Sequence, residues 1–236
     1  MTYKTELHLH SAEGSACGKA TAEEIVQVYL EAGYTTLVLT NHFSPWTFKC
    51  SRYDYSHFTP EEKVEYYIDA YHTLKEAAGD KLNVLFGMEL YPLDRDCDHL
   101  IYGMTEEFLR AHPDLMEKPF PETSALVREA GMILCQAHPF RNEMKVGDPK
   151  YLDGFEAYNA HTASFRNRLA KEWAEEFGLI KVGGSDYHGL HHKAESGIVT
   201  DFPITSNEEL LATLRSGNYK ILNKGEIIEI NKKEAE

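Results

Sequence analysis

Residues 6–42 read ELHLHSAEGSACGKATAEEIVQVYLEAGYTTLVLTNH and contain a complete strand–helix–strand unit. Its first strand is the short apolar run Glu6-Leu7-His8-Leu9. The capping box Thr21-Ala22-Glu23-Glu24 starts a helix, because the threonine and second glutamate side chains can each accept from the other residue's backbone N–H. The second run, Thr36–Thr40, is apolar and β-branched, which is typical of a buried strand. The unit therefore predicts two parallel strands joined by a helix.

The same alternation continues along the rest of the chain. Apolar runs predict further strands at 84–88, 132–135, 154–158 and 180–183, and capped or amphipathic segments predict helices at 59–79, 122–130, 165–178 and 206–217. Alternating strands and helices indicate a parallel α/β architecture, and no linker or low-complexity stretch divides residues 1–236, so we expect a single domain. The long loops 43–59 and 139–152 are of a length that is usually functional.

Composition and charge exclude several classes of protein. Asp and Glu number 38 against 24 Lys and Arg, a net charge of −14, and no basic cluster occurs, so long nucleic acid is not expected as the main ligand. No apolar run approaches the roughly 20 residues that span a bilayer, which argues against a membrane protein. The first residues lack a secretory signal, so we expect a cytoplasmic protein. The four cysteines form no CxxC pair and are interpreted as reduced thiols.

Potential metal ligands follow the predicted strands at their carboxyl ends. They are His8 and His10, His42, Glu89, His138, and Asp186 and His188. The carboxyl ends of the strands in a parallel α/β barrel open on one face, so these scattered side chains would converge there. The spacing of His8 and His10 places both on one face of a strand, roughly 6.6 Å apart along the chain. The same spacing separates Asp186 from His188.

Imidazole and carboxylate ligands together suit Zn, Mn or Fe, and a carboxylate such as Glu89 can bridge two ions. The sequence therefore predicts a multinuclear metal site, which His99 could join from the start of another apolar run. Other histidines are interpreted as surface or hydrogen-bonded residues: His57, His72 and His112. His191 and His192 lie on a predicted loop, where they are solvated or reach substrate.

The ordered motifs resemble the PHP (polymerase and histidinol phosphatase) superfamily of metal-dependent phosphoesterases, and among them the histidinol-phosphatase-like proteins. They are His8-x-His10, Thr40-Asn41-His42, Gly87-x-Glu89, Ala137-His138-Pro139 and Gly184-Ser185-Asp186-x-His188, and the resemblance covers residues 6 to about 222. It implies a distorted (β/α)7 TIM-like barrel that binds two or three divalent ions.

The resemblance also implies a ligand set for each ion. The first would be held by His8, His10, Glu89 and Asp186, and the second by Glu89, His99 and His138. The third would be held by His42, His188 and a residue of the loop after the first motif. That residue is Cys17, whose thiolate is a reasonable zinc or iron ligand; the alternatives are Glu13 or an unfilled third site.

Two segments support the ligands without joining them. Asn41 stands where the family commonly has Asp, so it would orient a ligand without adding charge. The segment Phe155-Glu156-Ala157-Tyr158-Asn159 resembles the family's Glu-x-x-Asn motif, a structural or supporting feature.

The chemistry implied is hydrolysis of a small phosphate monoester, in a phosphorylated metabolite, by a water activated between metals. Neither a Gly-x-Ser-x-Gly elbow nor a phosphate-binding GxxxxGK[ST] loop occurs in the chain. Arg141 is the first candidate to bind the phosphate and Arg166 the second, because guanidinium matches phosphate bidentately. A lid over the substrate is expected from residues of the 43–59 loop: Trp46, Phe48, Lys49, Arg52 and Tyr53.

Three other functions remain open from the sequence. Amidohydrolase barrels also begin with His-x-His and end with Asp, but they use a bridging modified lysine and have no glutamate equivalent to Glu89. A phosphodiesterase or exonuclease acting on short nucleotides would use the same metals with a different pocket. A binding module would hold the metals only for structure. Assays of amides against phosphoesters under different metals separate these classes.

Overall fold

The computed structural model describes residues 2–49 and 54–230 of the chain. Its strands are β1 (Tyr3–Leu9), β2 (Thr36–Leu39), β3 (His42–Phe43), β4 (Asn83–Leu90), β5 (His99–Tyr102), β6 (Ile133–Gln136), β7 (Gly154–Asn159), β8 (Ile180–Gly184), β9 (Gly197–Thr200), β10 (Lys220–Asn223) and β11 (Glu226–Glu229). Its helices are α1 (Ala22–Glu31), α2 (Pro45–Lys49), α3 (Pro60–Ala78), α4 (Glu106–Ala111), α5 (Phe120–Glu129), the short 3-10 helix Pro149–Tyr151, α6 (Ser164–Glu176) and α7 (Asn207–Ser216). All six strands and all five helices predicted from the sequence are present.

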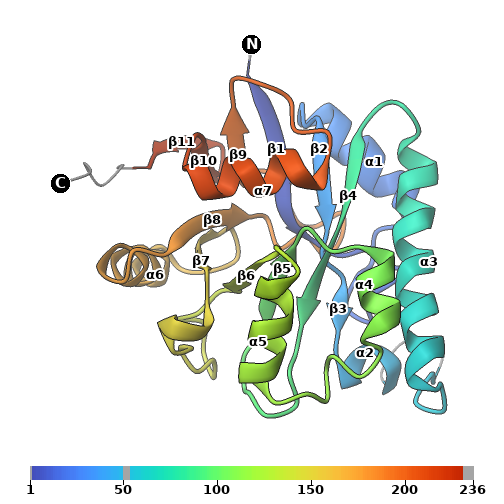
Figure 1. Ribbon diagram of the computed structural model, residues 1–236. Coiled ribbons are helices and arrows are strands. Elements are labelled where there is room, and N and C mark those ends of the chain that lie inside the picture. The colour runs from blue at the N-terminus through green and yellow to red at the C-terminus, as the bar shows by residue number, and fades with distance from the viewer. Residues whose placement is uncertain (1, 50–53, 231–236) are drawn as a thin grey trace.

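The strands form one curled sheet in a mixed α/β fold (Figure 1). Their order is β11-β10-β9-β1-β2-β4-β5-β6-β7-β8, with β3 beside β4. The groups β1-β2-β4 and β6-β7-β8 are parallel, as the alternation of strands and helices predicts. The parallel order fails at β5, which is antiparallel to both β4 and β6. The connection from β4 to β5 is too short for the crossover that a parallel pair requires.

The sheet curls until β8 returns to β1. There Leu9 and Tyr187 form an isolated parallel bridge, and the Tyr187 carbonyl accepts from the His10 N–H at 2.8 Å. The buried Glu6 carboxylate also joins these strands, because its Oε1 accepts from the backbone N–H of His8 and of Ser185, each at 2.9 Å. This meeting is a bridge and not a continuous ladder, so the complete (β/α)7 ring stays a prediction.

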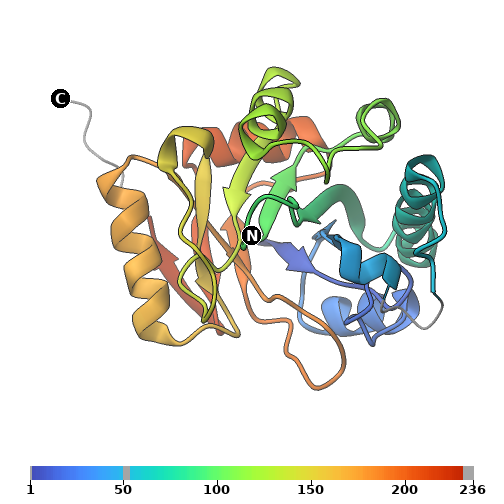
Figure 2. The same cartoon turned by 90° about the horizontal axis from the view of Figure 1, so that it is seen from below.

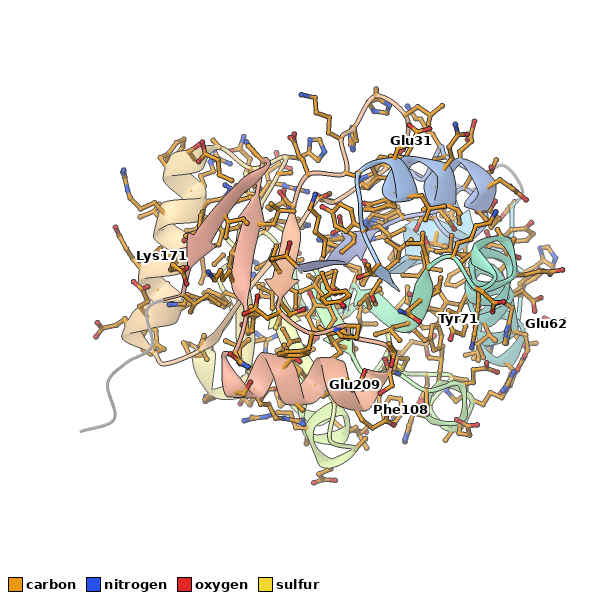
Figure 3. All side chains as sticks on the ribbon, turned by 90° about the horizontal axis from the view of Figure 1, so that it is seen from above. Glu31, Glu62, Tyr71, Phe108, Lys171 and Glu209 are labelled. Carbon is orange, nitrogen blue, oxygen red and sulfur yellow. The ribbon has the colours of Figure 1, made fainter. Side chains whose placement is uncertain are left out.

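Helices cover the outer face of the curled sheet, as the view from below shows for α1, α3, α5 and α6 (Figure 2). The capping boxes that start α1 and α3 are both formed, at Thr21 and Thr59. Charged side chains point outward from the helices, as Glu31, Glu62 and Glu209 show (Figure 3). The apolar stripe that predicted α6 is partly exposed instead of buried, since Phe165 is 54% exposed and Phe177 is 50% exposed.

Among residues 2–49 and 54–230, no helix has the length and apolarity that crossing a membrane requires.

The antiparallel strands β9 and β10 extend the sheet beyond β1. The strands β9, β10 and β11 were not predicted from the sequence, nor were the short β3, β5, α2 and α4. The parallel strands β1, β2 and β4 run in the same direction (Figure 1), so the residues that follow them reach the same rim of the sheet.

Candidate metal centre

The end of β1 directs the first two histidines into the curl of the sheet. The register of β1 against β2 shifts between Glu6 and Leu9, so strict alternation is interrupted there. His8 and His10 reach Glu89 inside the curl, whereas Glu6 accepts from the Tyr29 hydroxyl of α1 and Leu9 packs in the core between the sheet and its helices. The His8 and His10 side chains are completely buried. Two histidines therefore enter the interior at the carboxyl end of β1.

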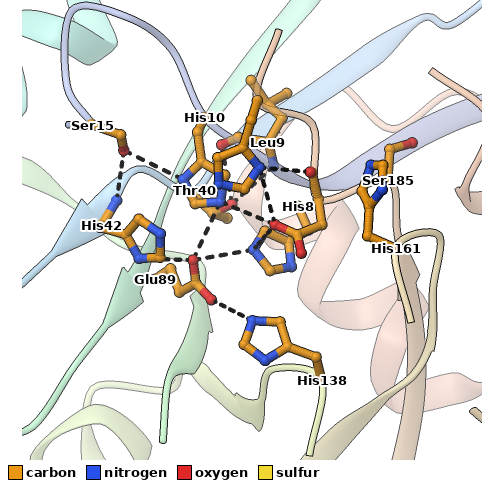
Figure 4. Close-up of polar contacts among 12 residues, drawn as sticks. His8, Leu9, His10, Ser15, Thr40, His42, Glu89, His138, His161 and Ser185 are labelled. Carbon is orange, nitrogen blue, oxygen red and sulfur yellow. Dashed lines mark hydrogen bonds and ion pairs between the residues drawn. The ribbon is translucent and has the colours of Figure 1, made fainter. Parts of the chain in front are cut away.

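Glu89 of β4 lies at the centre of the cluster (Figure 4). Its Oε2 is 2.9 Å from His42 Nδ1 and 3.2 Å from the Nε2 atoms of both His8 and His10. Its Oε1 is 3.1 Å from His138 Nε2. The pairing of β3 with β4 places His42 beside Glu89. One buried carboxylate thus contacts four imidazoles that come from separate parts of the chain.

The buried donor atoms fit a metal ion. His8 Nε2, His10 Nε2 and Glu89 Oε2 are buried and make no hydrogen bond of acceptable geometry within the described part of the chain. Leaving such an atom unpaired costs roughly 1–3 kcal/mol, more if it is charged. Neutral imidazoles and carboxylates that face one another at about 3 Å are ligands that Zn, Mn and Fe accept. A divalent cation would satisfy all three atoms together.

Four groups of side chains could each hold an ion, with their ligand atoms within 4.8 Å of one another. The groups are His8, His10 and Asp186; His8, Glu89 and His138; His10, Cys17, His42 and His188; and His42, Glu89 and Asp98. They share members, and each imidazole offers one nitrogen to this centre. His8 Nδ1 is already used by Glu156, so only Nε2 of His8 is available. Groups that share an imidazole therefore compete for it, and the four groups cannot all be complete at once.

Glu156 and Asn159 fix the orientation of these ligands. Glu156 Oε1 is 2.8 Å from His8 Nδ1, and Oε2 accepts from the His138 backbone N–H at 2.9 Å. The Asn159 side chain donates to Glu156 Oε2 at 3.0 Å and to Asp186 Oδ2 at 3.2 Å. A carboxylate on the far nitrogen of a ligating histidine fixes its tautomer and raises its basicity. The Glu-x-x-Asn segment therefore supports ligands from three strands.

Asn41 acts through the loop after β1 and not directly on a ligand ring. Its Oδ1 accepts from the Ser11 N–H at 2.8 Å and from the Ser15 hydroxyl at 3.0 Å. The Ser15 hydroxyl in turn accepts from the His42 N–H at 2.9 Å and lies 3.3 Å from His10 Nδ1 (Figure 4). The amide thus holds the serine that orients His10.

Two of the candidate ligands have unusual backbone conformations. His138 has φ 29° and Asp186 has φ 51°, in the left-handed region that side chains with a Cβ rarely adopt. Such conformations cost on the order of 1–3 kcal/mol and persist where the surroundings impose them, often at functional sites. In both residues the strained backbone directs the side chain to the cluster.

The electrostatics follow from burial and from the mixture of charges. Burial opposes ionisation of Glu89, but His42 and His8 outweigh it and lower its pKa well below the ordinary value. Burial likewise opposes a charge on the Cys17 thiol, but hydrogen bonds with His188 and His42 lower its pKa to about 6. Carboxylate and thiolate are therefore favoured in their metal-binding forms.

The structure separates His99 from the cluster. In the β4–β5 register His99 lies opposite Leu90, whereas Leu100 lies opposite Glu89, so His99 and Glu89 point to opposite faces. The His99 ring stacks on Phe120 with centroids 4.2 Å apart, and its Nε2 is 3.8 Å from Cys97 Sγ. His99 belongs to none of the four groups, and its neighbour Asp98 belongs to one.

Cys17 is placed with His10, His42 and His188, whereas Glu13 accepts from the Ala22 N–H at 3.0 Å, near the start of α1. His57, His72, His112, His161, His191 and His192 are not members of the four groups. Of these, His72 pairs with Glu106 on the helices, and His192 stacks on His161 with centroids 3.7 Å apart.

Arg141 lies at the edge of the cluster. Its guanidinium donates to Asp186 Oδ2 and, at 3.1 Å, to Asn159 Oδ1. Arg166, at the start of α6, donates to the Asn142 side chain. Arg166 therefore contacts the 139–152 loop, to which Arg141 belongs. A cation beside a candidate ligand is placed to receive an anion bound there.

The expected lid is divided by the structure. Phe48 is buried against Phe43 in the core, so its assignment to a lid is wrong, whereas Lys49 is exposed. Arg52 and Tyr53 lie outside the described residues. Trp46 is exposed and lines a cavity beside Cys17 and His42.

Sequence reasoning missed three residues of the centre. Glu6 could not have been found from strand spacing, because β1 is irregular between Glu6 and Leu9 and the Glu6 carboxylate contacts Tyr29 of α1 instead of Glu89. Ser15 and Asp98 carried no usable signal, since their roles come from a loop and a strand start that the pattern does not place.

The curled sheet and the imidazole–carboxylate cluster at its rim define a metal-binding α/β protein. The PHP domain family matches residues 6–232, and the chain belongs to this family. The resemblance identified from the motifs is thereby confirmed. No curated protein sequence matches the chain.

Three solved structures share the fold. A two-domain protein from Bacteroides vulgatus, containing a predicted PHP-like metal-dependent phosphoesterase, is 14% identical with a TM-score of 0.70 over 96% of this chain and 66% of that one. An amidohydrolase from Chromobacterium violaceum with bound sulfate and no metal is 14% identical, with a TM-score of 0.56 over 94% and 98%. The lesion-specific endonuclease EndoQ from Pyrococcus furiosus is 12% identical, with a TM-score of 0.62 over 94% and 58%. The chain thus spans 66% of the length of the Bacteroides protein and 58% of the length of EndoQ.

Proposed function

We propose that this protein hydrolyses a small phosphate monoester at a site of two or three divalent metal ions. The observation that carries the proposal is Glu89, a buried carboxylate within 3.2 Å of ring nitrogens of His8, His10, His42 and His138. Membership of the PHP family supports the same chemistry. The ions could be Zn, Mn or Fe, because the donors mix imidazole, carboxylate and one thiol.

The ligand assignment that we propose follows the groups in space. His8, His10 and Asp186 would hold one ion, with Glu89 reaching it through Oε2; His138 and the Oε1 of Glu89 would begin a second. Cys17, His42 and His188 would hold a third. His99 has no place in this assignment, because it points to the face opposite Glu89 and contacts Phe120.

Divalent ions bound there would supply a Lewis acid and lower the pKa of a water. The reaction forms a bond from the water oxygen to phosphorus and breaks the ester P–O bond, and the leaving alcohol takes up a proton. The protein's own contribution is to hold the ligands rigidly through Glu156 and Asn159 and to bind the phosphate. Arg141, beside Asp186 and Asn159, would donate to its non-bridging oxygens, and Arg166 is the second candidate.

The comparisons support a phosphoester more than they define it. EndoQ is described as a lesion-specific endonuclease, but the net charge of −14 and the lack of a basic cluster argue against a long nucleic acid as the substrate of this chain. The Chromobacterium protein is described as an amidohydrolase with bound sulfate, an anion of the shape of phosphate. We therefore propose the phosphoester and retain the amide as the competing substrate.

The test uses p-nitrophenyl phosphate with protein loaded separately with Zn, Mn and Fe. Alanine at His138 or at Asp186 should reduce turnover to background, because each removes a ligand that no neighbour replaces. Arg141→Ala should raise KM about tenfold or more while leaving metal content unchanged, since a hydrogen bond to a charged group is worth about 1.5–3 kcal/mol. Retained activity in the His138 and Asp186 variants would refute the site, and hydrolysis of amides alone would refute the substrate class.

A further inference from the structure

A cavity of about 320 Å³ adjoins the metal centre beside α2. Cys17 and His42, candidate ligands of the third ion, form part of its wall. The rest of the wall includes Trp46, Tyr91, Asp98 and Met144. The cavity therefore opens directly from the atoms that would bind the reacting phosphate.

The wall is assembled mainly from apolar side chains of distant segments. Trp46 belongs to α2, Tyr91 follows β4, and Met144 belongs to the 139–152 loop. Trp46 is 59% exposed, which is a large apolar surface left open beside a polar site. Exposed apolar surface in a concave site of this kind typically marks where a ligand binds.

In the described part of the chain, the cavity wall contains no lysine or arginine and one acidic side chain. None of the residues found to line the cavity within 2–49 and 54–230 is a lysine or an arginine, and Asp98 contributes a buried carboxyl group. Arg141 is not part of this wall. Its guanidinium donates to Asn159, the last residue of β7, and to Asp186, just after β8. The cation that suits a phosphate and the apolar wall are therefore separate parts of the centre.

We propose that this cavity receives the leaving alcohol of the substrate and that it selects an uncharged, apolar group the size of an aromatic ring. The inference rests on the proposed phosphomonoester hydrolysis and specifies its substrate class. A closed apolar cavity of about 150 Å³ holds benzene, so the observed volume accommodates one ring with its substituents. Trp46 and Met144 are then specificity-determining residues, and a second anionic group on the alcohol is disfavoured next to Asp98.

Three phosphates with alkyl leaving groups test the inference. Benzyl phosphate carries the ring, ethyl phosphate lacks it, and 4-carboxybenzyl phosphate adds a negative charge to the same ring. For the metal-loaded protein we expect kcat/KM to be about tenfold higher for benzyl than for ethyl phosphate, the effect of burying part of an aromatic ring. We expect 4-carboxybenzyl phosphate to lose about tenfold relative to benzyl phosphate.

Variants locate the preference in the cavity. Trp46→Ala and Met144→Ala should each raise KM for benzyl phosphate, so that kcat/KM for benzyl phosphate falls to within about twofold of kcat/KM for ethyl phosphate. Phe177→Ala is the matched control, because it removes an aromatic ring that is half exposed and outside the cavity. It should keep the preference.

A binding measurement gives a second readout that does not depend on activity. Benzyl alcohol should shift the indole N–H signal of Trp46 in an NMR spectrum of the protein as purified. The signal is assigned by its loss in Trp46→Phe, and the signal of the second tryptophan, Trp173, should stay fixed.

Each outcome separates the two proposals. Turnover of ethyl and benzyl phosphates at equal rates, or better turnover of the carboxylated ester, would overturn the inference while leaving phosphomonoester hydrolysis intact. A fixed Trp46 signal would also overturn it. Failure of all three esters under Zn, Mn and Fe would instead overturn the proposed function.

Discussion

At the scale of single residues, the centre depends on how each polar atom is occupied. His8 is the clearest case, because Nδ1 is committed to Glu156 and Nε2 faces Glu89 without a hydrogen bond. Burying such an arrangement is costly unless an ion completes it. The division of the ring into one supported and one open nitrogen is what distinguishes this histidine from a core residue such as His99, which stacks on Phe120.

The support given by Glu156 leads to a prediction about metal affinity. Glu156→Gln keeps the size of the side chain but removes the charge from His8 Nδ1, and loss of such a partner typically costs 10–100-fold in metal affinity or activity. We expect a loss of that size in a zinc titration against a competing chelator. Glu175→Gln is the control, since Glu175 pairs with Lys171 and Lys181 and belongs to none of the four candidate metal groups. Unchanged zinc affinity in Glu156→Gln would show that this carboxylate does not support a ligand.

The thiol of Cys17 predicts a pH dependence. Burial opposes its ionisation, but hydrogen bonds with His188 and His42 lower the pKa from 9.0 to about 6. Alkylation of Cys17 in the metal-free protein should therefore rise through about pH 6. Because the folded pKa is depressed, the thiolate stabilises the fold above about pH 9, and this contribution is lost as the pH falls through about 6.

Peptide mapping by mass spectrometry distinguishes Cys17 from Cys97, whose pKa burial raises to about 12. Added zinc should protect Cys17 from alkylation if the thiolate binds the third ion. A midpoint near 9, or alkylation that zinc leaves unchanged, would place Cys17 outside the centre and return the position to Glu13 or to no ligand.

Most of the cluster could be predicted from the sequence because its members follow strands whose direction the helix–strand alternation defines. The exceptions are instructive. His99 begins an apolar run as a ligand would, but the antiparallel pairing of β5 turns it to the face opposite Glu89. That orientation depends on a register set by a short connection, and a single sequence does not show the register.

At the scale of elements, the parallel strands carry the site and the antiparallel ones complete the sheet. Six strands and five helices were predicted because each has a periodic apolar pattern bounded by caps or glycines. The strands β9, β10 and β11 were missed because they pair antiparallel after the last candidate ligand, where the expectation of parallel strands no longer holds. The sheet curls until β8 meets β1, and at this β1–β8 contact Glu6, His8 and Gly184 come together.

Gly184 lies where β8 packs closely against β1, and this leads to a prediction about stability. A Cβ at this position would lie closer than 3.0 Å to His8 Cβ and 2.8 Å from Glu156 Oε1. Gly184→Ala should therefore lower the free energy of unfolding by about 2–3 kcal/mol or more and reduce metal affinity, because His8 must move. Chemical denaturation measures the first effect.

Gly217→Ala is the matched control for strain without a clash. Its φ is 66°, at the end of α7, and a Cβ there meets nothing within 4 Å. We expect it to cost only about 1 kcal/mol. Equal losses in the free energy of unfolding for the two substitutions would show that the contact between β1 and β8 has room for a side chain.

At the scale of the whole molecule, the chain is acidic, and its candidate metal-binding imidazoles lie together at one rim of the sheet. The net charge of −14 disfavours a polyanionic ligand, yet the centre itself gathers candidate ligands from both ends of the chain, from His8 to His188. Such a cluster binds ions only in the folded state, so metal binding and folding are coupled. Ions at about 100 times their Kd would add about 2.7 kcal/mol of stability.

The most direct test of the central claim is the position of the ions in a crystal of the metal-loaded protein, located by anomalous scattering. The account predicts at least two peaks within about 2.0–2.3 Å of the ligand atoms, with Glu89 bound to two of them and Nε2 of His8 bound to one. Peaks located away from Glu89, or a single ion that leaves His8 and His138 unbound, would contradict it.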